Sequence, residues 1–521
     1  MRKCILKFLE ETPVMKLDLF TKRHASKIQG ILSCLDRVII TGTIPEICYT
    51  GGMSSLLNAM KIRIFDYTKW AEPLREEIRA NAERLARVNG LEIEFIRRKN
   101  FKKEDRVQQI VERRGLHPGL VHIFSAMERC PSYKPWHNKK THRTYLKHTD
   151  AKCLHYYFYF IDPEFGLCYL RVPTWAPFRL QFYHNGHNEL AVKLRKKHIG
   201  FKMLDNTFLQ IDDFNEAQRL ANSIRPERLH KKLDQIAQAF CPVIRNFISG
   251  YHWSLMQVEY ATDIVFRQQA DLRPIYEELV RTTTHSVKPE NIATFFGRKL
   301  VGQYKDEMGN NFYTRIEGTC IRHHMGKVAI KMYDKYAIIL RIETVANDVS
   351  FFKHHRRVEH RDGTWSMKVA PVKKSIYSLP VLLELMQAAN RRYLEFISAI
   401  DDPTSAVRDL EKISKPIKDA QRSWRGFNLF HGDDLDLFRA ITYGQFNISG
   451  FQNRNIRNIL SGKTGQQISR MLKRLRKHGL IKKIGTRYKY YLTALGRKVI
   501  ATGLKLREMF IIPSLRGKFA L

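Results

Sequence analysis

The sequence predicts an α+β protein of several domains, with a mixed α/β body at the N-terminus, a strand-rich middle section and a small C-terminal domain of helices and one hairpin. Strand and helix patterns alternate up to residue 115, and aromatic strands follow from residue 154. After residue 430, amphipathic helices precede a basic hairpin. With 521 residues and 44% hydrophobic composition, the chain is long enough for about three packed domains.

Residues 1–150 are expected to form an α/β domain. The run LSCLDRVIITGTI predicts a buried strand, and two amphipathic helices end at Gly90 and Gly115, because glycine favours the left-handed conformation at a helix C-terminus. The predicted elements are strand 32–44, helix 53–60, strand 62–65, helix 71–89, strand 91–96 and helix 103–114. Alternation of this kind is typical of a sheet layered by helices.

Residues 151–300 begin with the aromatic sequence LHYYFYFIDPEFGLCYLRV, which predicts two strands joined by a turn at 162–166. Residues 225–300 are expected to be mainly helical, with one of the helices at 261–269. Residues 301–425 are expected to return to strands, followed by helices at 380–400 and 405–423.

Positive charge is spread along the whole chain. The sequence has 90 Lys and Arg residues against 51 Asp and Glu residues, a formal net charge of +39. This indicates a long polyanionic partner, because binding releases counterions from phosphates. We expect no membrane partner, since no run of about 18 apolar residues occurs. The eight cysteines form no CxxC pair, which predicts reduced thiols and a cytoplasmic protein.

Residues 430–510 predict a winged helix-turn-helix domain. Two helices at 433–446 and 452–460 precede a third that begins after the N-cap Thr464 and ends at Gly479, and a hairpin follows. The third helix has an apolar stripe, and its other face carries amides and cations that suit the base edges and phosphates of double-stranded DNA. The predicted DNA-binding residues are Gln466, Gln467, Ser469, Arg470, Lys473, Arg474, Lys477, Lys482, Lys483, Arg487 and Lys489.

This region resembles the winged helix-turn-helix domains of MarR-like and ArsR-like regulators. The resemblance lies in the pattern S-R-x-L-x-x-L-x-x-x-G-L-I and in the Y-x-L-T-x-x-G-R that leaves the wing. It implies docking of the third helix in the major groove. The alternative is a winged helix used only for protein contacts, with a basic face that is merely solvated.

A second group of candidate residues lies on the predicted strand pair KMYDK and LRIE. A tyrosine hydroxyl can attack a phosphodiester when a metal held by carboxylates polarises the phosphate. Tyr333 or Tyr336 is the candidate nucleophile. The candidate ligands for Mg²⁺ or Mn²⁺ are Asp334, Glu343 and His324, and Lys335 or Arg341 is the candidate to hold the phosphate. The alternative is a half-buried sheet with cross-strand ion pairs and no catalysis.

Residues 321–345 resemble the Y-D-K…R-x-E portion of rolling-circle replication initiators from plasmids and filamentous phages. The resemblance implies a tyrosine that nicks one DNA strand. Those enzymes often carry two histidines separated by one residue, and no pair of histidines in this sequence has that spacing.

A basic loop near residue 140 combines potential zinc ligands with aromatic residues. Cysteine and histidine are the ligand types that zinc prefers, so a structural zinc is one reading. The metal-ligand candidates are Cys130, His137, Cys153 and His155. Tyr133, Trp136 and Tyr145 lie among cations in the same loop, a combination that also suits single-stranded nucleic acid.

These features together predict a DNA-binding protein of mobile-element or replication-initiator type, in which the winged helix selects the site and the body handles the strand. One alternative is a non-catalytic transcriptional regulator whose body serves dimerisation or sensing. A second is an RNA-binding factor. We expect double-stranded DNA as the main partner, single-stranded DNA or RNA as further candidates, and a homodimer is compatible with the sequence. No phosphate-binding GxxxxGK[ST] loop, GxGxxG or GxSxG motif is present.

Overall fold

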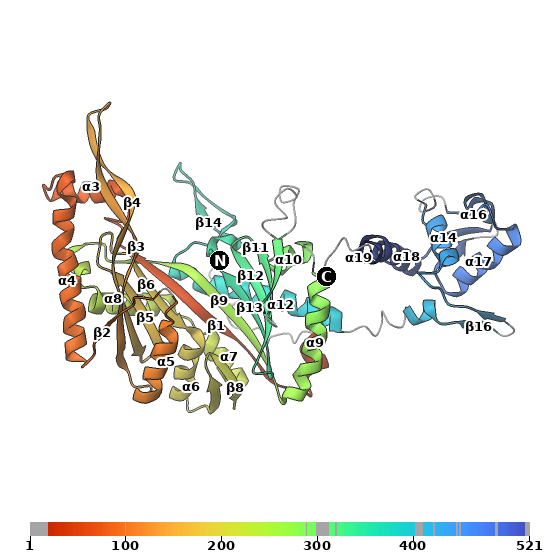
Figure 1. Cartoon of the computed structure of the whole chain (residues 1–521), viewed down its shortest axis with the longest axis horizontal. Helices are drawn as coiled ribbons and strands as arrows, with labels where there is room; N and C mark the ends of the chain where they lie inside the picture. Colours follow the sequence, from red (N-terminus) through yellow and green to blue (C-terminus); the bar gives the residue numbers. More distant parts are fainter. Residues whose placement is uncertain are drawn as a thin grey trace. The chain divides into compact units, whose positions relative to one another are not determined.

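The computed structural model divides the chain into two compact units, residues 1–401 and 402–521 (Figure 1). The residues it describes are 19–98, 100–287, 289–298, 312–317, 320–401, 410–419, 422–443, 446, 450–484 and 488–515. Among them, no helix is both long enough and apolar enough to cross a membrane.

The first unit is built on one eleven-stranded sheet, in the order β10-β11-β12-β13-β9-β1-β6-β5-β4-β3-β2. All neighbouring strands are antiparallel except β2 and β3. The strands are β1 (Ile28–Thr43), β2 (Ile93–Phe95), β3 (Gly119–Asn138), β4 (Arg143–Asp162), β5 (Gly166–Pro173), β6 (Leu180–Asn185), β9 (His252–Phe266), β10 (Phe312–Glu317), β11 (Cys320–Met325), β12 (Val328–Lys335) and β13 (Ile339–Ala346). The large mixed sheet confirms the α/β character of the body.

The ranges 1–150, 151–300 and 301–425, which the sequence suggested as separate domains, all contribute strands to this sheet. Residue 150 itself lies within β4. Two predicted elements of the first unit are wrong: residues 64–66 form a short 3₁₀ helix in place of a strand, and residues 261–266 of the helix expected at 261–269 are the C-terminal part of β9. Thr262, Ile264 and Val265 are β-branched, and β9 lies between β13 and β1, where such side chains pack well on both faces.

Helices cover the two faces of the sheet unequally. One face packs on α4 (Tyr67–Val88), α8 (Pro226–Phe240), α9 (Gln269–Ser286) and α12 (Leu379–Asp401), and together they enclose the main hydrophobic core. We call the opposite face the polar face. It packs on α5 (Lys103–Arg114) at one end, and on α6 (Gly186–Lys196) and α7 (Phe214–Asn222) over the N-terminal half of β1. These two smaller cores leave part of the polar face uncovered.

Two hairpins project from the first unit (Figure 1). β3 and β4 are 20 residues each. Residues 143–154 of β4 pair with β3 alone, so this part of the two strands forms a hairpin that ends in the turn at 139–142. The second is the separate hairpin of β14 (Lys353–Glu359) and β15 (Trp365–Pro371).

The second unit contains α14 (Gly432–Ile441), α16 (Asn453–Ile459), α17 (Gly465–Lys477), the hairpin of β18 (Ile481–Ile484) and β19 (Lys489–Leu492), and α18 (Ala494–Leu506). Its core includes Phe438, Ile468, Leu472 and Leu475. The Thr464 side chain accepts a hydrogen bond from the backbone of Gln467, and the Gln467 side chain bonds back to the backbone of Thr464. Part of the helix expected at 405–423 is instead a short strand pair, β16 (Ile417–Asp419) and β17 (Arg422–Trp424).

Candidate functional site

A fully buried arginine lies at the centre of the large sheet. Arg341 on β13 is directly opposite Asp263 on β9, and its guanidinium donates to both carboxylate oxygens at 2.6 and 2.7 Å. It also donates to His187 Nε2 at 3.2 Å, and its Nη1 lies 3.5 Å from Asp36 on β1. Burial raises the pKa of Asp263, but the charge of Arg341 outweighs this effect and lowers the pKa to about 2.

Three carboxylates gather beside this ion pair. Asp36, Glu259 and Glu343 each place an oxygen within 4.8 Å of the others, the one such group of potential metal ligands found in the described part of the chain. Asp36 accepts hydrogen bonds from Asn185 at 2.7 Å and Asn206 at 2.6 Å. We call this group the carboxylate centre.

Glu343 is the most unusual member of the carboxylate centre. It is 1% exposed, and its Oε2 accepts hydrogen bonds from Lys331 at 2.9 Å and Tyr333 at 3.1 Å. Its Oε1 is buried and accepts no hydrogen bond from the described residues. Burial, together with the nearby Glu259 and Asp36, raises its pKa to about 8, although Lys331 acts in the opposite direction. A proton or a divalent cation between the carboxyl groups would relieve this repulsion, and oxygen ligands suit Mg²⁺ and Mn²⁺.

The structure brings only some of the predicted catalytic residues together. Tyr333 contacts Glu343, and burial raises the Tyr333 pKa far above its usual range. Asp334 is the next residue along β12, so its side chain lies on the other face of the sheet. Tyr336 lies in the β12–β13 turn, where its hydroxyl donates to the carboxylate of Asp205. Tyr333 and Glu343 therefore remain as one site, without Asp334 and Tyr336.

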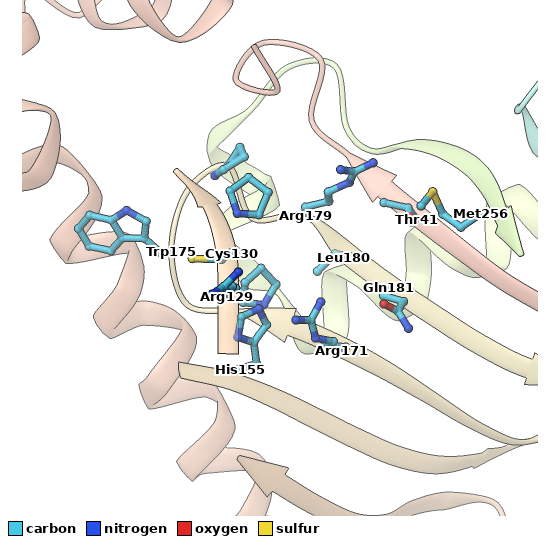
Figure 2. Close-up of a pocket in the computed structure, with 13 residues that line it drawn as sticks. Thr41, Arg129, Cys130, His155, Arg171, Trp175, Arg179, Leu180, Gln181 and Met256 are labelled. Atoms are coloured by element: carbon cyan, nitrogen blue, oxygen red, sulfur yellow. The ribbon is translucent and has the colours of Figure 1, made fainter. Parts of the chain in front are cut away.

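A second site is a pocket of about 200 Å³ on the polar face (Figure 2). Arg129, Arg171 and Arg179 line it, together with His155 and Gln181. Arg171 is paired with Glu128 at 2.6 Å, whereas no ion pair involves Arg129 or Arg179 among the described residues. We call this the arginine pocket; its surplus of positive charge suits an oxyanion.

Two of the four predicted zinc ligands, Cys130 and His155, line the arginine pocket, and Cys153 lies next to His155. Cys153 Sγ is 3.8 Å from His155 Nδ1, and a hydrogen bond from Cys130 together with His155 lowers the pKa of Cys153 to about 5, against the opposing effect of burial. His137 lies near the tip of the β3–β4 hairpin, where its ring bonds to Thr144 at 3.0 Å. The structure therefore does not bring the four predicted ligands together.

The predicted DNA-binding residues of the second unit divide into exposed and structural ones. Gln466, Arg470 and Lys473 are exposed, with Lys477 half-buried beside them, and the helical period places all four on the side of α17 opposite its buried residues. Arg474 instead is buried, with bonds of 2.7 and 2.9 Å to Asp434. It is unavailable to DNA.

The remaining predicted positions have mixed environments. Gln467 caps its own helix, Ser469 is bonded to Asn453 at 2.8 Å, and Lys477 lies 2.5 Å from Asp419. In the hairpin, Lys482 is exposed, Lys483 lies 3.5 Å from the centre of the Tyr488 ring, Lys489 is half-buried, and Arg487 lies outside the described residues. Exposed cations that the sequence analysis missed are Arg454, Arg457 and Arg476.

Sequence reasoning also missed Asp36, Glu259 and Asp263, although each lies among apolar residues in a strand sequence. A buried acid needs a hydrogen-bonding or charged partner, and that signal was available in LSCLDRVII and VEYATDIVF. No family model, curated protein or solved structure matches the chain, so its function has to be inferred from the residues and contacts described above.

Proposed function

We propose that the protein binds double-stranded DNA through its second unit, which acts as a winged helix-turn-helix with α17 as the recognition helix. The supporting observation is the stripe of Gln466, Arg470, Lys473 and Lys477 opposite the buried side of α17. The helix contains no acidic residue. An amide and cations on one helix face match the donors and acceptors of the major groove and its flanking phosphates.

The order of elements supports the same proposal. A helix pair, α16 and α17, is followed by a hairpin whose strands carry Lys482, Lys483 and Lys489. In a winged helix-turn-helix, the first helix of such a pair supports the second, and the hairpin lies along the neighbouring backbone. The sequence likeness to MarR-like and ArsR-like domains agrees with this arrangement.

The test is a titration of fluorescently labelled duplex DNA with full-length protein at several salt concentrations. Replacing Arg470 and Lys473 by Ala should weaken binding at least tenfold and lower the salt dependence of log K by about 2. The matched control is Arg497→Ala with Lys498→Ala, which removes the same charge from exposed positions on α18. Equal losses in the two variants would show that only net charge matters, and would rule out α17 as the reading helix.

A second candidate function is metal-dependent cleavage of a DNA strand at the carboxylate centre. Its supporting observation is the buried Glu343. One of its oxygens accepts a hydrogen bond from the Tyr333 hydroxyl, and the other has no hydrogen-bond partner in the described part of the chain. In this step the Tyr333 oxygen attacks the phosphorus, its proton passes to the ionised form of Glu343, and the departing sugar oxygen takes a proton from water. The products are a phosphotyrosine and a free hydroxyl end. A cation held by the centre would neutralise charge on the phosphate.

This function is tested with supercoiled plasmid in Mg²⁺ or Mn²⁺ and in EDTA. Relaxed circles and a covalent adduct at Tyr333 are expected only with the metal. Tyr333→Phe should abolish both, whereas Tyr336→Phe, the matched control in the adjacent turn, should retain them. DNA binding without any cleavage would leave a non-catalytic regulator, and preference for RNA over duplex DNA would favour an RNA-binding factor.

A further inference from the structure

The β3–β4 hairpin presents aromatic and basic side chains on one face. Trp136 is directly opposite Tyr145, and Lys134 is directly opposite Lys147. Since residues two apart on a strand share a face, all four side chains lie on the same side of the hairpin. Trp136 is 43% exposed and Tyr145 is 38% exposed, and the ammonium of Lys147 lies 3.8 Å from the Trp136 ring centre.

The β3–β4 hairpin carries six cations between residues 131 and 152. Two lysines directly opposite each other repel and destabilise a hairpin. Among the residues that the structure describes, none of the six cations forms an ion pair. These cations are Lys134, Lys139, Lys140, Arg143, Lys147 and Lys152. A polyanionic ligand would remove the repulsion.

The register of the sheet links the hairpin to both sites on the polar face. Further along β3 and β4, Cys130 and His155 share the face of Trp136 and Tyr145, and they border the arginine pocket. Cross-strand pairing carries this face from Arg171 on β5 to Gln181 on β6 and to Thr41 on β1.

Beyond β1, the same face reaches the carboxylate centre. Gln257 and Glu259 continue it on β9, and Glu343 is paired with Lys331 on β13 and β12. Six strand spacings of about 4.8 Å separate β4 from β12, a path of about 29 Å. Gln257, Glu259 and Lys331 are each partly exposed, with side-chain exposures of 13% for Glu259 and 18% for Lys331, so solvent reaches this part of the face.

We propose that a single strand of DNA lies along this polar face, with bases stacked on Trp136 and Tyr145, a phosphate in the arginine pocket and a phosphodiester further along the strand at the carboxylate centre. The inference rests on the second candidate function, because it names that function's substrate. Exposed aromatic rings favour unpaired bases, since a duplex keeps its bases stacked on one another. Arginine and lysine side chains along the path supply the phosphate contacts.

The experiment measures binding of labelled dT20 by anisotropy, using full-length protein with Arg470→Ala and Lys473→Ala to suppress binding through α17. We expect each of Trp136→Leu and Tyr145→Leu to weaken binding about tenfold, and Trp136→Phe to restore most of it, because an aromatic face is sufficient. Lys134→Ala with Lys147→Ala should reduce the salt dependence of log K by about 2. Thermal melting confirms that these exposed substitutions leave the fold intact.

The matched control is Lys152→Ala, an exposed lysine on the opposite face of the same hairpin. It should lose less than twofold. The proposal is overturned if dT20 does not bind, if duplex DNA binds the hairpin better, if rU20 binds more tightly than dT20, or if Lys152→Ala loses as much as Trp136→Leu. The dT20 titration measures binding and the plasmid assay measures cleavage. A protein that binds dT20 normally but never nicks the plasmid therefore refutes the second candidate function alone.

Discussion

Replacing Arg341 by Met should destabilise the first unit strongly at neutral pH. The guanidinium is 0% exposed and donates two hydrogen bonds to Asp263, and Asp36 lies 3.5 Å away. Removing one partner of a buried ion pair leaves the other charge uncompensated, at a cost of about 3–5 kcal/mol in the free energy of unfolding. Methionine fills similar volume, so little of the loss comes from a cavity.

The pH dependence of this loss follows from the pKa of Asp263. In the wild type the pKa falls from 3.8 to about 2, which corresponds to about 2 kcal/mol of stability. A lowered pKa gives stability that is present above pH 3.8 and is lost as the pH falls through 2. Without Arg341, burial raises the Asp263 pKa instead, so the variant should gain stability as the pH falls toward 4.

Urea denaturation at pH 7 and at pH 4, followed by the fluorescence of the buried Trp253, provides the measurement. The difference between wild type and Arg341→Met should be larger at pH 7. The double variant Arg341→Met with Asp263→Leu removes both charges and should recover much of the loss. A loss below 1 kcal/mol at pH 7, or a double variant no more stable than the single one, would refute this account of the ion pair.

Three further predictions concern the carboxylate centre, the second unit and the turn that leads into α6. Glu343 has a raised pKa of about 8, so its contribution to stability is complete below pH 4.5 and is lost as the pH rises through 8; Glu343→Gln should therefore be more stable than the wild type at pH 9. At pH 8, Mn²⁺ should raise the melting temperature of the wild type and leave that of Glu343→Gln unchanged. Arg474→Ala should destabilise the second unit by about 3 kcal/mol through loss of its bonds to Asp434, whereas Arg470→Ala should weaken DNA binding with an unchanged melting curve. A side chain at Gly186 would meet the backbone oxygen of Leu35 at 2.3 Å, so calorimetry should show Gly186→Ala destabilised by about 1–3 kcal/mol, against no change for Gly432→Ala, where the space is open.

Locally encoded elements were the ones that the sequence predicted well. The helix α17 begins after the N-cap Thr464 and ends at Lys477, two residues before Gly479, which has a φ of +71°. Both signals act within one turn of the helix end that they mark. The turn between β4 and β5 was likewise predicted, since Asp162 accepts hydrogen bonds from the backbone of residues 164 and 165.

Elements that depend on distant partners were predicted poorly. β9 was expected to be helical in part, because its sequence alone does not reveal that it lies between β1 and β13. The carboxylate centre joins Asp36 to Glu343, more than 300 residues apart, through a strand order that no local pattern specifies. The sequence identified Glu343 and Tyr333 as a pair because the β12–β13 hairpin is local, and it missed the acids from β1 and β9 for the opposite reason.

The position of β1 between β6 and β9 also has consequences for synthesis of the chain. β1 can pair with β6 as soon as residue 185 has been made, but its other edge stays open until β9 follows at residue 252. At about 5–20 residues per second, translation of the residues in between takes about 3–13 s. During that interval a 16-residue, largely apolar strand offers unpaired backbone groups to other chains. Until β9 has been made, the strand at the centre of the finished sheet is therefore a segment through which newly made chains can associate.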